Sequence, residues 1–286
     1  MPHLSGTMAT WVGDIGGSSS RWAVIAGGVG TELPGPFPGF NPLVGDPSAM
    51  QAALREAAHL LPGATATQVV AYGAGCGAPV RARCVQQALA GVWPGAQVQV
   101  ESDLLGAARG LYGDGKGLVL NLGTGMNSGY YDGLFLHTPM PSLGYMLGDE
   151  GSGADIGKHL LRDALYGSVP GAIAASLFPQ GLDLPAVLEA TYRSPGPQAY
   201  VASFTAKLAG HVDHPYVHDL VMARFFAMAR LLERFFAPDE RREVKAVGSV
   251  AYGFQGLLAT ALDHYGMALM GVLRDPLPGL IAFHSR

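Results

Sequence analysis

The sequence predicts an α/β protein of two lobes, each a mixed sheet flanked by helices, and its 286 residues suffice for two modest cores. One observation behind this prediction is a pattern that occurs twice: a strand, a glycine-rich turn and a second strand, around Gly16 and again around Gly123. The other is that apolar strands and helical segments follow each hairpin, which favours a sheet covered by helices. Glycine provides 41 of the 286 residues, as expected for a fold with many tight turns.

The first lobe is expected to open with two short strands, over 10–14 and 21–26, joined by a Gly/Ser turn. Ser48 is a suitable N-cap for a helix over 48–61. The other elements expected in this lobe are strands over 68–72 and 97–101 and helices over 79–90 and 104–111.

The second lobe repeats the opening with strands over 117–122 and 126–131, and Asp132-Gly133 is a turn signal that leads into a third strand over 133–137. The chain then becomes mostly helical. Its remaining elements are helices over 154–166, 217–236 and 251–265, strands over 244–247 and 268–272, and a short terminal helix. We expect the boundary near 103–106, with residues 1–104 in the first lobe, 105–275 in the second, and 276–286 returning to the first.

The composition excludes several classes of function. The net charge is −4 without a long run of one sign, which argues against nucleic-acid or acidic-membrane binding. The two cysteines, Cys76 and Cys84, form no C-x-x-C pair, which indicates a reducing cytoplasm. We expect no signal peptide and no membrane span, because no basic start leads into an apolar run and no window of about 18 apolar residues occurs.

The first glycine turn has the composition of a phosphate-binding hairpin. Asp14 precedes it and has the side chain to hold Mg²⁺, directly or through water. The turn itself supplies two glycines that permit close backbone approach to a phosphate and three hydroxyl donors: Gly16, Gly17, Ser18, Ser19 and Ser20. An ordinary Gly/Ser hairpin is an equally good interpretation of this turn taken alone.

The second glycine turn strengthens the interpretation of the first turn as a phosphate-binding hairpin. It contains Gly123, Thr124, Gly125 and Asn127, and it again lies between two predicted strands. Two such hairpins that face each other can bind a nucleoside triphosphate between two lobes.

Two further segments carry small or acidic residues. Asp149 and Glu150 lie in a glycine-rich loop just before a predicted helix, where a capping role is the simpler alternative. Gly248 and Ser249 join a strand to a helix, and small residues there allow a flat ring such as adenine to lie on the backbone.

The order and spacing of these four elements resemble the N-acetylglucosamine kinase family. This family is a branch of the BadF/BadG/BcrA/BcrD-type ATPases within the actin-like ATPase superfamily. The resemblance covers nearly the whole chain, and its most specific part is the run 143–157, supported by 247–251 and 275–280. It implies a two-lobed, ribonuclease H-like fold with a cleft between the lobes, and the phosphorylation of an amino sugar by ATP with Mg²⁺.

The resemblance also implies roles for individual residues. Asp103 matches the catalytic aspartate, while Asn41 and Asp149, with Glu150 beside it, match sugar-binding positions. The two glycine turns become phosphate elements, and Gly248 with Ser249 belongs to the adenosine element. The first turn departs from the family pattern because it lacks a lysine, whose phosphate contact Arg21 is expected to replace in part.

Several alternatives stay open at this stage. Taken alone, Asp103 fits a helix N-cap somewhat better than a catalytic role. N-acetylglucosamine, N-acetylmuramic acid and glucosamine are all candidate substrates, and the apolar composition is compatible with a homodimer.

Two other functions occur on the same fold: an activator ATPase that holds an iron–sulfur cluster, and a sugar-sensing protein without turnover. The spacing of Cys76 and Cys84 does not match a cluster signature. His211, His214 and His218 are interrupted by Pro215, and we interpret them as a solvated loop and helix start rather than a zinc site.

Overall fold

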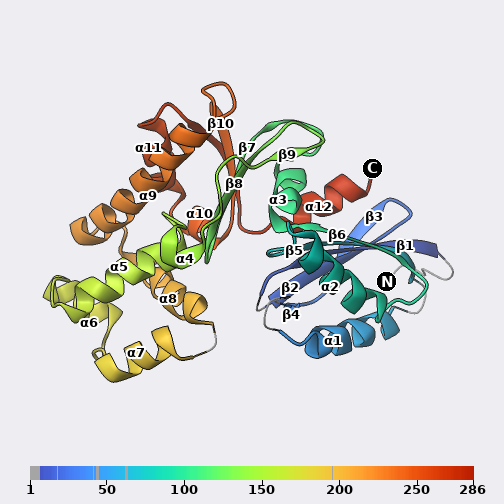
Figure 1. Cartoon of the computed structure of the whole chain (residues 1–286), viewed down its shortest axis with the longest axis horizontal. Helices are drawn as coiled ribbons and strands as arrows, with labels where there is room; N and C mark the ends of the chain where they lie inside the picture. The colour runs from blue at the N-terminus through green and yellow to red at the C-terminus, as the bar shows by residue number, and fades with distance from the viewer. Residues whose placement is uncertain (1–6, 18, 41, 43–44, 62–63, 195) are drawn as a thin grey trace. The chain divides into compact units, whose positions relative to one another are not determined.

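The computed structural model describes residues 7–17, 19–40, 42, 45–61, 64–194 and 196–286. The chain divides into two compact units (Figure 1): the first comprises Met1–Gly115 with Asp275–Arg286, and the second Lys116–Arg274. The division after Gly115 lies beyond the expected boundary because helix α3 (Asp103–Tyr112) packs on the sheet and on the C-terminal helix of the first unit. That C-terminal helix, α12 (Leu277–His284), belongs to the first unit.

The sheet of the first unit has the strand order β3-β2-β1-β5-β6, with β4 pairing with β2. Its members are β1 (Thr7–Ile15), β2 (Ser19–Ala26), β3 (Val29–Glu32), β4 (Phe37–Pro38), β5 (Ala64–Gly73) and β6 (Gln97–Ser102). The first three strands form an antiparallel meander, and β5 and β6 extend the sheet in parallel with β1. Parallel β1, β5 and β6 therefore end at the same edge of the sheet.

Residues that alternate along the strands supply two apolar faces to the first unit. One face packs under α1 (Ser48–His59) and α2 (Pro79–Ala90), where the rings of Trp11 and Trp22 both lie against Trp93. The other face, which includes Val70 and Tyr72, is covered by α12. The prediction of Ser48 as an N-cap is wrong by one residue, since Pro47 is the N-cap and Ser48 begins the helix.

The second unit has the strand order β11-β10-β7-β8-β9. Its strands are β7 (Gly117–Leu122), β8 (Met126–Tyr131), β9 (Leu136–His137), β10 (Glu243–Val247) and β11 (Ala268–Leu273). This order repeats that of the first unit: an antiparallel meander, then two strands parallel to the first strand. The third strand is shorter than the predicted 133–137 because the Asp132 carboxylate accepts the N–H groups of Leu134 and Phe135 and holds them in a turn.

Helices surround the apolar core of the second unit. They are α4 (Gly144–Leu147), α5 (Gly153–Leu165), α6 (Gly171–Leu177), α7 (Leu184–Tyr192), α8 (Pro197–Ala206), α9 (Pro215–Phe235), α10 (Ser249–Gly253) and α11 (Gln255–Asp263). Helix α9 buries the stripe Val217, Val221, Phe225, Met228 and Leu232, which follows the helical period. The single helix expected over 251–265 is instead two helices separated at Phe254.

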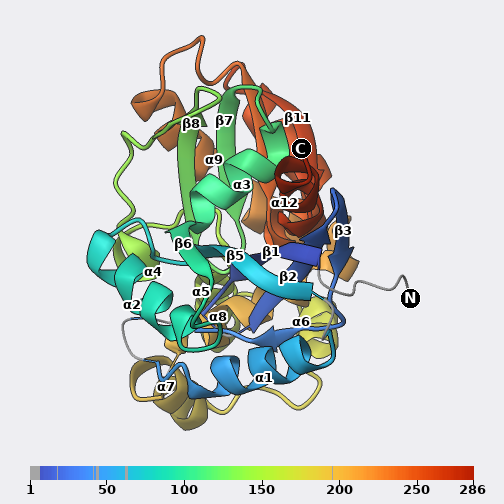
Figure 2. The same ribbon diagram turned by 90° about the vertical axis from the view of Figure 1, so that its right-hand side faces the viewer.

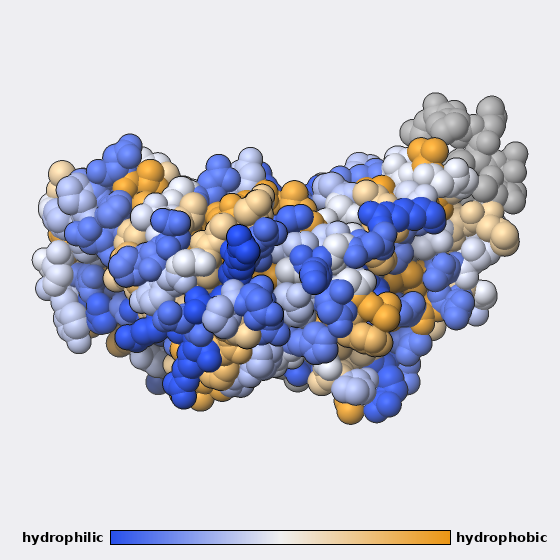
Figure 3. Space-filling model, turned by 90° about the horizontal axis from the view of Figure 1, so that it is seen from above, coloured by the Kyte–Doolittle hydropathy of each residue, from blue (hydrophilic) through white to orange (hydrophobic). Residues whose placement is uncertain are grey.

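In the part of the chain that the structure describes, every helix is too short or too polar to cross a lipid bilayer. Figure 3 shows hydrophilic and hydrophobic residues interspersed over the face in view.

The crossing of α3 and α12 predicts a sensitive glycine in the first unit. These helices lie side by side in Figures 1 and 2, and a Cβ added to Gly279 would lie 2.0 Å from the carbonyl oxygen of Gly110. Gly279→Ala must therefore push the two helices apart, and we expect it to lower the free energy of unfolding by about 1–3 kcal/mol. Urea unfolding followed by circular dichroism measures the change.

The control is Gly95→Ala, because a Cβ at Gly95 meets no atom within 4 Å. Equal unfolding midpoints for the two variants would contradict the close packing of α3 and α12.

Candidate functional site

Two carboxylates of the first unit lie at the edge where the parallel strands end. Asp14 is the penultimate residue of β1, and Asp103 begins α3 directly after β6. Strand β5 lies between them, and its Tyr72 pairs with Asp14 on one side and with Glu101 on the other. In open α/β sheets this edge is where ligands bind.

Both carboxyl groups are electrostatically strained. Burial raises the pKa of Asp14 to about 7, with further upward contributions from the charges of Asp103 and Asp275 and an opposing one from Arg21. Burial likewise raises the pKa of Asp103 to about 6, against the hydrogen bond from the Leu104 backbone N–H. A set of mutually repelling carboxylates favours the uptake of a proton or a cation.

The structure separates Asp103 from the capping role. The Ser102 side chain is the N-cap of α3, because its oxygen accepts the N–H of Leu105 at 3.2 Å. Asp103 occupies the first helical position, where its Oδ1 accepts the N–H of Leu104 at 2.9 Å. The helix N-terminus thus fixes the direction of the Asp103 carboxylate.

The first glycine turn forms the β1–β2 hairpin. The N–H of Gly16 donates to the carbonyl of Ser19 at 2.9 Å, and the carbonyl of Gly16 accepts the N–H of Phe40 at 3.1 Å. Gly17 and Ser19 are exposed at this turn. Two of the predicted residues, Ser18 in the turn and Asn41 in the sugar site, lie outside the described residues.

One expectation for this hairpin needs correction. Ser20 is buried, and its hydroxyl donates to the carbonyl of Pro38 at 2.8 Å while accepting the indole N–H of Trp22 at 3.0 Å. It therefore supports the hairpin instead of donating to a phosphate. The guanidinium of Arg21 bridges Glu32 and Asp275, and its contact with phosphate stays a prediction.

The donor set around Asp14 fits Mg²⁺ accompanied by a nucleotide. Among the described residues, no three His, Cys, Asp or Glu side chains are grouped to hold a metal ion by themselves. Mg²⁺ commonly uses one or two carboxylates, several waters and the phosphates of its substrate, so a dedicated cage is not required.

The second glycine turn is fixed from the side of α5. The backbone N–H groups of Gly153 and Ala154 donate to the carbonyls of Gly123 and Thr124, at 2.8 and 3.0 Å. The turn is closed by the N–H of Gly123, which donates to the carbonyl of Gly125 at 3.0 Å. The N-terminus of α5 thereby orients the peptide groups of the turn.

Gly248 brings the β10–α10 connection onto the same turn. Its φ is +120°, a conformation that L side chains rarely adopt, and an added Cβ would lie 2.4 Å from the Leu122 carbonyl oxygen. Its N–H donates to the carbonyl of Leu273 at 3.0 Å. Only glycine allows β10 and the second glycine turn to approach this closely.

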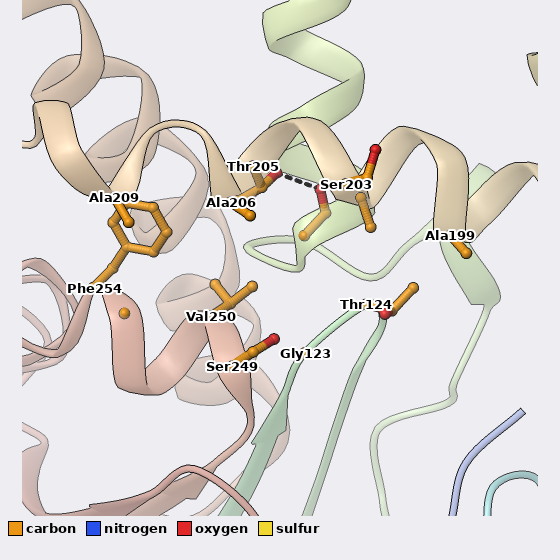
Figure 4. A pocket seen from close by; sticks show the side chains of 13 residues that line it. Gly123, Thr124, Ala199, Ser203, Thr205, Ala206, Ala209, Ser249, Val250 and Phe254 are labelled. Carbon is orange, nitrogen blue, oxygen red and sulfur yellow. Dashed lines mark hydrogen bonds between the residues drawn. The ribbon is translucent and has the colours of Figure 1, made fainter. Parts of the chain in front are cut away.

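A pocket of about 340 Å³ lies in the second unit beside this turn. Figure 4 shows Ala199, Ser203 and Ala206 on one side and Ser249 and Val250 on the other, with Gly123 and Thr124 at one end. The pocket is also lined by Gly153, Ala202, Thr205, Ala209, Gly253 and Phe254. Its size is in the range of small-molecule sites, and its walls of mostly small residues leave room for a planar ring.

Asp149 packs directly against the second glycine turn. It is buried and adopts φ +60°, and an added Cβ at Gly125 would lie 2.9 Å from its Oδ2. Burial raises the pKa of Asp149, while the backbone N–H of Met126 acts in the opposite direction. Gln198 on α8 donates to the same carboxylate at 3.4 Å.

The predicted residues fall into two groups, one in each unit. The first unit holds Asp14, Gly16, Gly17, Ser19, Ser20 and Asp103; the second holds Gly123, Thr124, Gly125, Asn127, Asp149, Glu150, Gly248 and Ser249. Within the second unit, the elements carrying Gly123, Asp149 and Gly248 converge on one turn. Asn127 lies in β8, where its Oδ1 accepts the N–H of Ser128 at 2.9 Å.

Sequence reasoning missed the wall that α8 contributes to the pocket. The lining residues Ala199, Ala202 and Ala206 are three and four residues apart, which is the helical period of a face made of small side chains. This spacing could have indicated a helix. The segment was not predicted as one because Pro197 at its start, and the glycine and proline before it, are typical of a loop.

The three histidines that were weighed as a zinc site each have a separate hydrogen bond. His211 pairs with Ser176, His214 accepts the N–H of Tyr216 at the start of α9, and His218 pairs with Asp219.

Comparison with solved structures gives a close relative. A protein from Porphyromonas gingivalis with a provisional assignment as N-acetylglucosamine kinase is 34% identical, with a TM-score of 0.85 over 96% of this chain and 98% of that chain. A Chromobacterium violaceum protein with the same provisional assignment is 21% identical, with a TM-score of 0.69 over 96% and 98% of the two chains. A Streptomyces griseus glucokinase, solved with glucose and AMPPNP, shares the fold at 17% identity, a TM-score of 0.55 and coverage of 96% and 97%. No protein-family model and no curated sequence matches the chain.

Asp155 anchors the loop that contains Asp149. Its buried carboxylate accepts the N–H of Gly151 at 3.0 Å and the Nε–H of Arg224 at 2.8 Å. Burial alone would raise the pKa of Asp155, but the hydrogen bonds from His159, Arg224 and Gly151 outweigh it and lower the pKa to about 2. The carboxylate therefore joins α5, α9 and the loop in its charged form.

We expect Asp155→Asn to lower the free energy of unfolding at pH 7 by about 3–5 kcal/mol, because it leaves the Arg224 guanidinium without its buried partner charge. The folded pKa of about 2 lies below the ordinary 3.8, so the stabilisation is present above about pH 4 and is lost as the pH falls toward 2. Urea unfolding at several pH values measures the effect. Asp219→Asn, at an exposed carboxylate, is the control, and a pH-independent difference between the variants would contradict the charge-based explanation.

Proposed function

The chain belongs to the N-acetylglucosamine kinase family of the actin-like ATPase superfamily, and from this premise we propose that it transfers the γ-phosphoryl group of ATP to a hydroxyl group of an amino sugar. The observation that carries this proposal is the pocket of the second unit, which opens beside a glycine turn fixed by three converging backbone segments. A nucleoside in this pocket has its phosphates next to peptide groups of that turn.

Different residues are proposed to bind the base, the phosphates and the metal ion of the nucleotide. Ser249 and Val250 support the base, Gly123 to Gly125 receive the phosphates, and Gly16, Gly17 and Ser19 of the first unit supply the other phosphate turn. Asp14 would hold Mg²⁺, which when bound neutralises charge on the phosphates. Phosphoryl transfer requires mainly positioning and electrostatic stabilisation from the protein.

Asp103 is the proposed base. Its carboxylate orients the acceptor hydroxyl and accepts its proton as the phosphoryl group moves to the oxygen. A pKa of about 6 leaves the group ionised at neutral pH and yet basic enough to take up a proton. The backbone N–H of Leu104 donates to this carboxylate and holds it in a fixed direction.

The sugar is proposed to contact Asp149 and Glu150, together with Asn41. N-acetylglucosamine is the first candidate, with N-acetylmuramic acid and glucosamine as alternatives. The homodimer and the cytoplasmic location stay predictions.

Of the two cysteines, Cys76 is buried and Cys84 is exposed, and both are free thiols.

The test of the function is a coupled ADP-release assay over a panel of amino sugars and neutral hexoses, with the product identified by NMR. We expect sugar-dependent ADP release that is greatest for an N-acetylated amino sugar. ATP binding without turnover on any sugar would favour the sugar-sensing alternative, and rapid sugar-independent hydrolysis would favour the activator ATPase.

We expect Asp103→Asn to lower kcat by about 10²–10⁴-fold, the usual contribution of a general base. ATP affinity should change little, because the nucleoside pocket lies in the other unit. The matched control is Asp114→Asn, at a carboxylate of the first unit that is 80% exposed. A normal kcat in Asp103→Asn removes this residue from the mechanism.

The pH profile gives an independent check on Asp103. Its pKa is raised to about 6, so the fraction of carboxylate falls as the pH drops through 6. We expect kcat/KM of the wild type to fall with it, because the protonated form accepts no proton. The residual activity of Asp103→Asn should not fall in this way between neutral and acidic pH. If kcat/KM of the variant falls at acidic pH as in the wild type, another group causes the decrease.

A further inference from the structure

The side chains that line the pocket of the second unit offer a bound base few groups with which to recognise its edge. None of the side chains that line it carries a charge or an amide group. Four hydroxyl groups are its polar side-chain atoms, from Thr124, Ser203, Thr205 and Ser249. The remaining lining residues are glycines, alanines, Val250 and Phe254.

Two of these hydroxyls already donate to backbone carbonyls. The Thr205 hydroxyl donates to Gly153 at 2.7 Å and is buried, and the Ser203 hydroxyl donates to Tyr200 at 2.7 Å within α8. Figure 4 shows the Thr205 hydrogen bond as a dashed line. The backbone of α8 bonds largely within its own helix, so its alanines present methyl groups to the pocket.

Hydroxyl groups are poor discriminators between purines. Adenine has an amino group where guanine and hypoxanthine have a carbonyl oxygen, so a selective site needs a fixed donor or a fixed acceptor there. The hydrogen of a serine or threonine hydroxyl rotates, which allows the same oxygen to donate or to accept. Thr124 and Ser249 can therefore satisfy either base.

From this composition we infer that the pocket selects a flat purine ring by shape and accepts ATP, GTP and ITP as phosphoryl donors with little preference. The inference rests on the proposed kinase function and names its donor class. Sites that discriminate strongly, by about 10⁴–10⁵-fold, hold buried polar groups that are left unpaired by the wrong ligand, whereas apolar pockets reach about 10²-fold. With this lining, we expect the pocket to discriminate weakly, as apolar pockets do.

We expect the shape of the pocket walls to control the affinity for purine nucleotides. Ala206 lies at the end of α8, opposite the side from which Val250 projects (Figure 4). A larger side chain at this exposed position fills the space of the ring without disturbing the core. It should weaken the binding of every purine nucleotide alike, because it acts through shape.

The first experiment measures kcat/KM for ATP, GTP and ITP with one saturating sugar, and binding of the same nucleotides by competition against a fluorescent ATP analogue without sugar. We expect the three values of kcat/KM, and the three affinities, to lie within about 10²-fold of one another. A preference for ATP greater than about 10²-fold in affinity overturns the inference.

The second experiment compares Ala206→Leu with Ala186→Leu, an alanine-to-leucine change at an exposed position of α7 outside the pocket. We expect Ala206→Leu to reduce the affinities for ATP, GTP and ITP by similar factors, about tenfold or more, while the affinity for inorganic tripolyphosphate is retained. Ala186→Leu should leave all four unchanged. A loss confined to ATP in Ala206→Leu would show recognition of the adenine edge and overturn the inference.

The two readouts separate this inference from the proposed function. Failure of ATP to bind at all contradicts both. Comparable binding of the three nucleotides without sugar phosphorylation contradicts the kinase function and leaves the binding inference supported. Sugar phosphorylation with ATP alone contradicts only the inference.

Discussion

The organisation of the second unit depends on one close approach of backbone segments. The turn at Gly123 receives the N-terminus of α5 through two hydrogen bonds and the β10–α10 connection through direct contact with Gly248. Both approaches are close: a Cβ on Gly153 would lie 3.1 Å from the Gly123 carbonyl oxygen, a tight contact, and a Cβ on Gly248 would clash at 2.4 Å with the Leu122 carbonyl oxygen. Because the same segments border the pocket, these glycines help to set its shape.

The two units use the same strand order for different chemistry. In both, an antiparallel meander is extended by two strands parallel to the first. The first unit places carboxylates, Asp14 and Asp103, at the ends of its parallel strands or directly after them. The second places Gly248 and Ser249 after β10, where they contribute space and backbone. A single architecture thereby provides a charged site and an uncharged pocket.

Much of this arrangement was predictable from the sequence, and the failures have identifiable causes. The glycine turns and strands follow from local patterns, since clusters of glycine between apolar runs are strong signals of turns. The use of the Ser20 hydroxyl was not predictable, because it depends on Trp22 and on the carbonyl of Pro38, eighteen residues away. The partners of Arg21 include Asp275, which is distant in sequence and reaches the first unit only through the fold. The capping role passed from Asp103 to Ser102 because the helix begins one residue earlier than its apolar pattern suggests.

The electrostatics of the first unit are best explained by ligand binding rather than by stability. Burial raises the pKa values of Asp14 and Asp103, and the charges of Asp103 and Asp275 raise that of Asp14 further, which means that the charged forms destabilise the folded unit at neutral pH. The contrast with Asp155 is informative, since that carboxylate is buried among donors and its pKa falls. At Asp14 and Asp103, by contrast, burial is the largest cause and the pKa rises. In the proposed reaction, a proton taken from the substrate hydroxyl would neutralise Asp103, and a cation that accompanies the phosphates would offset the charge of Asp14.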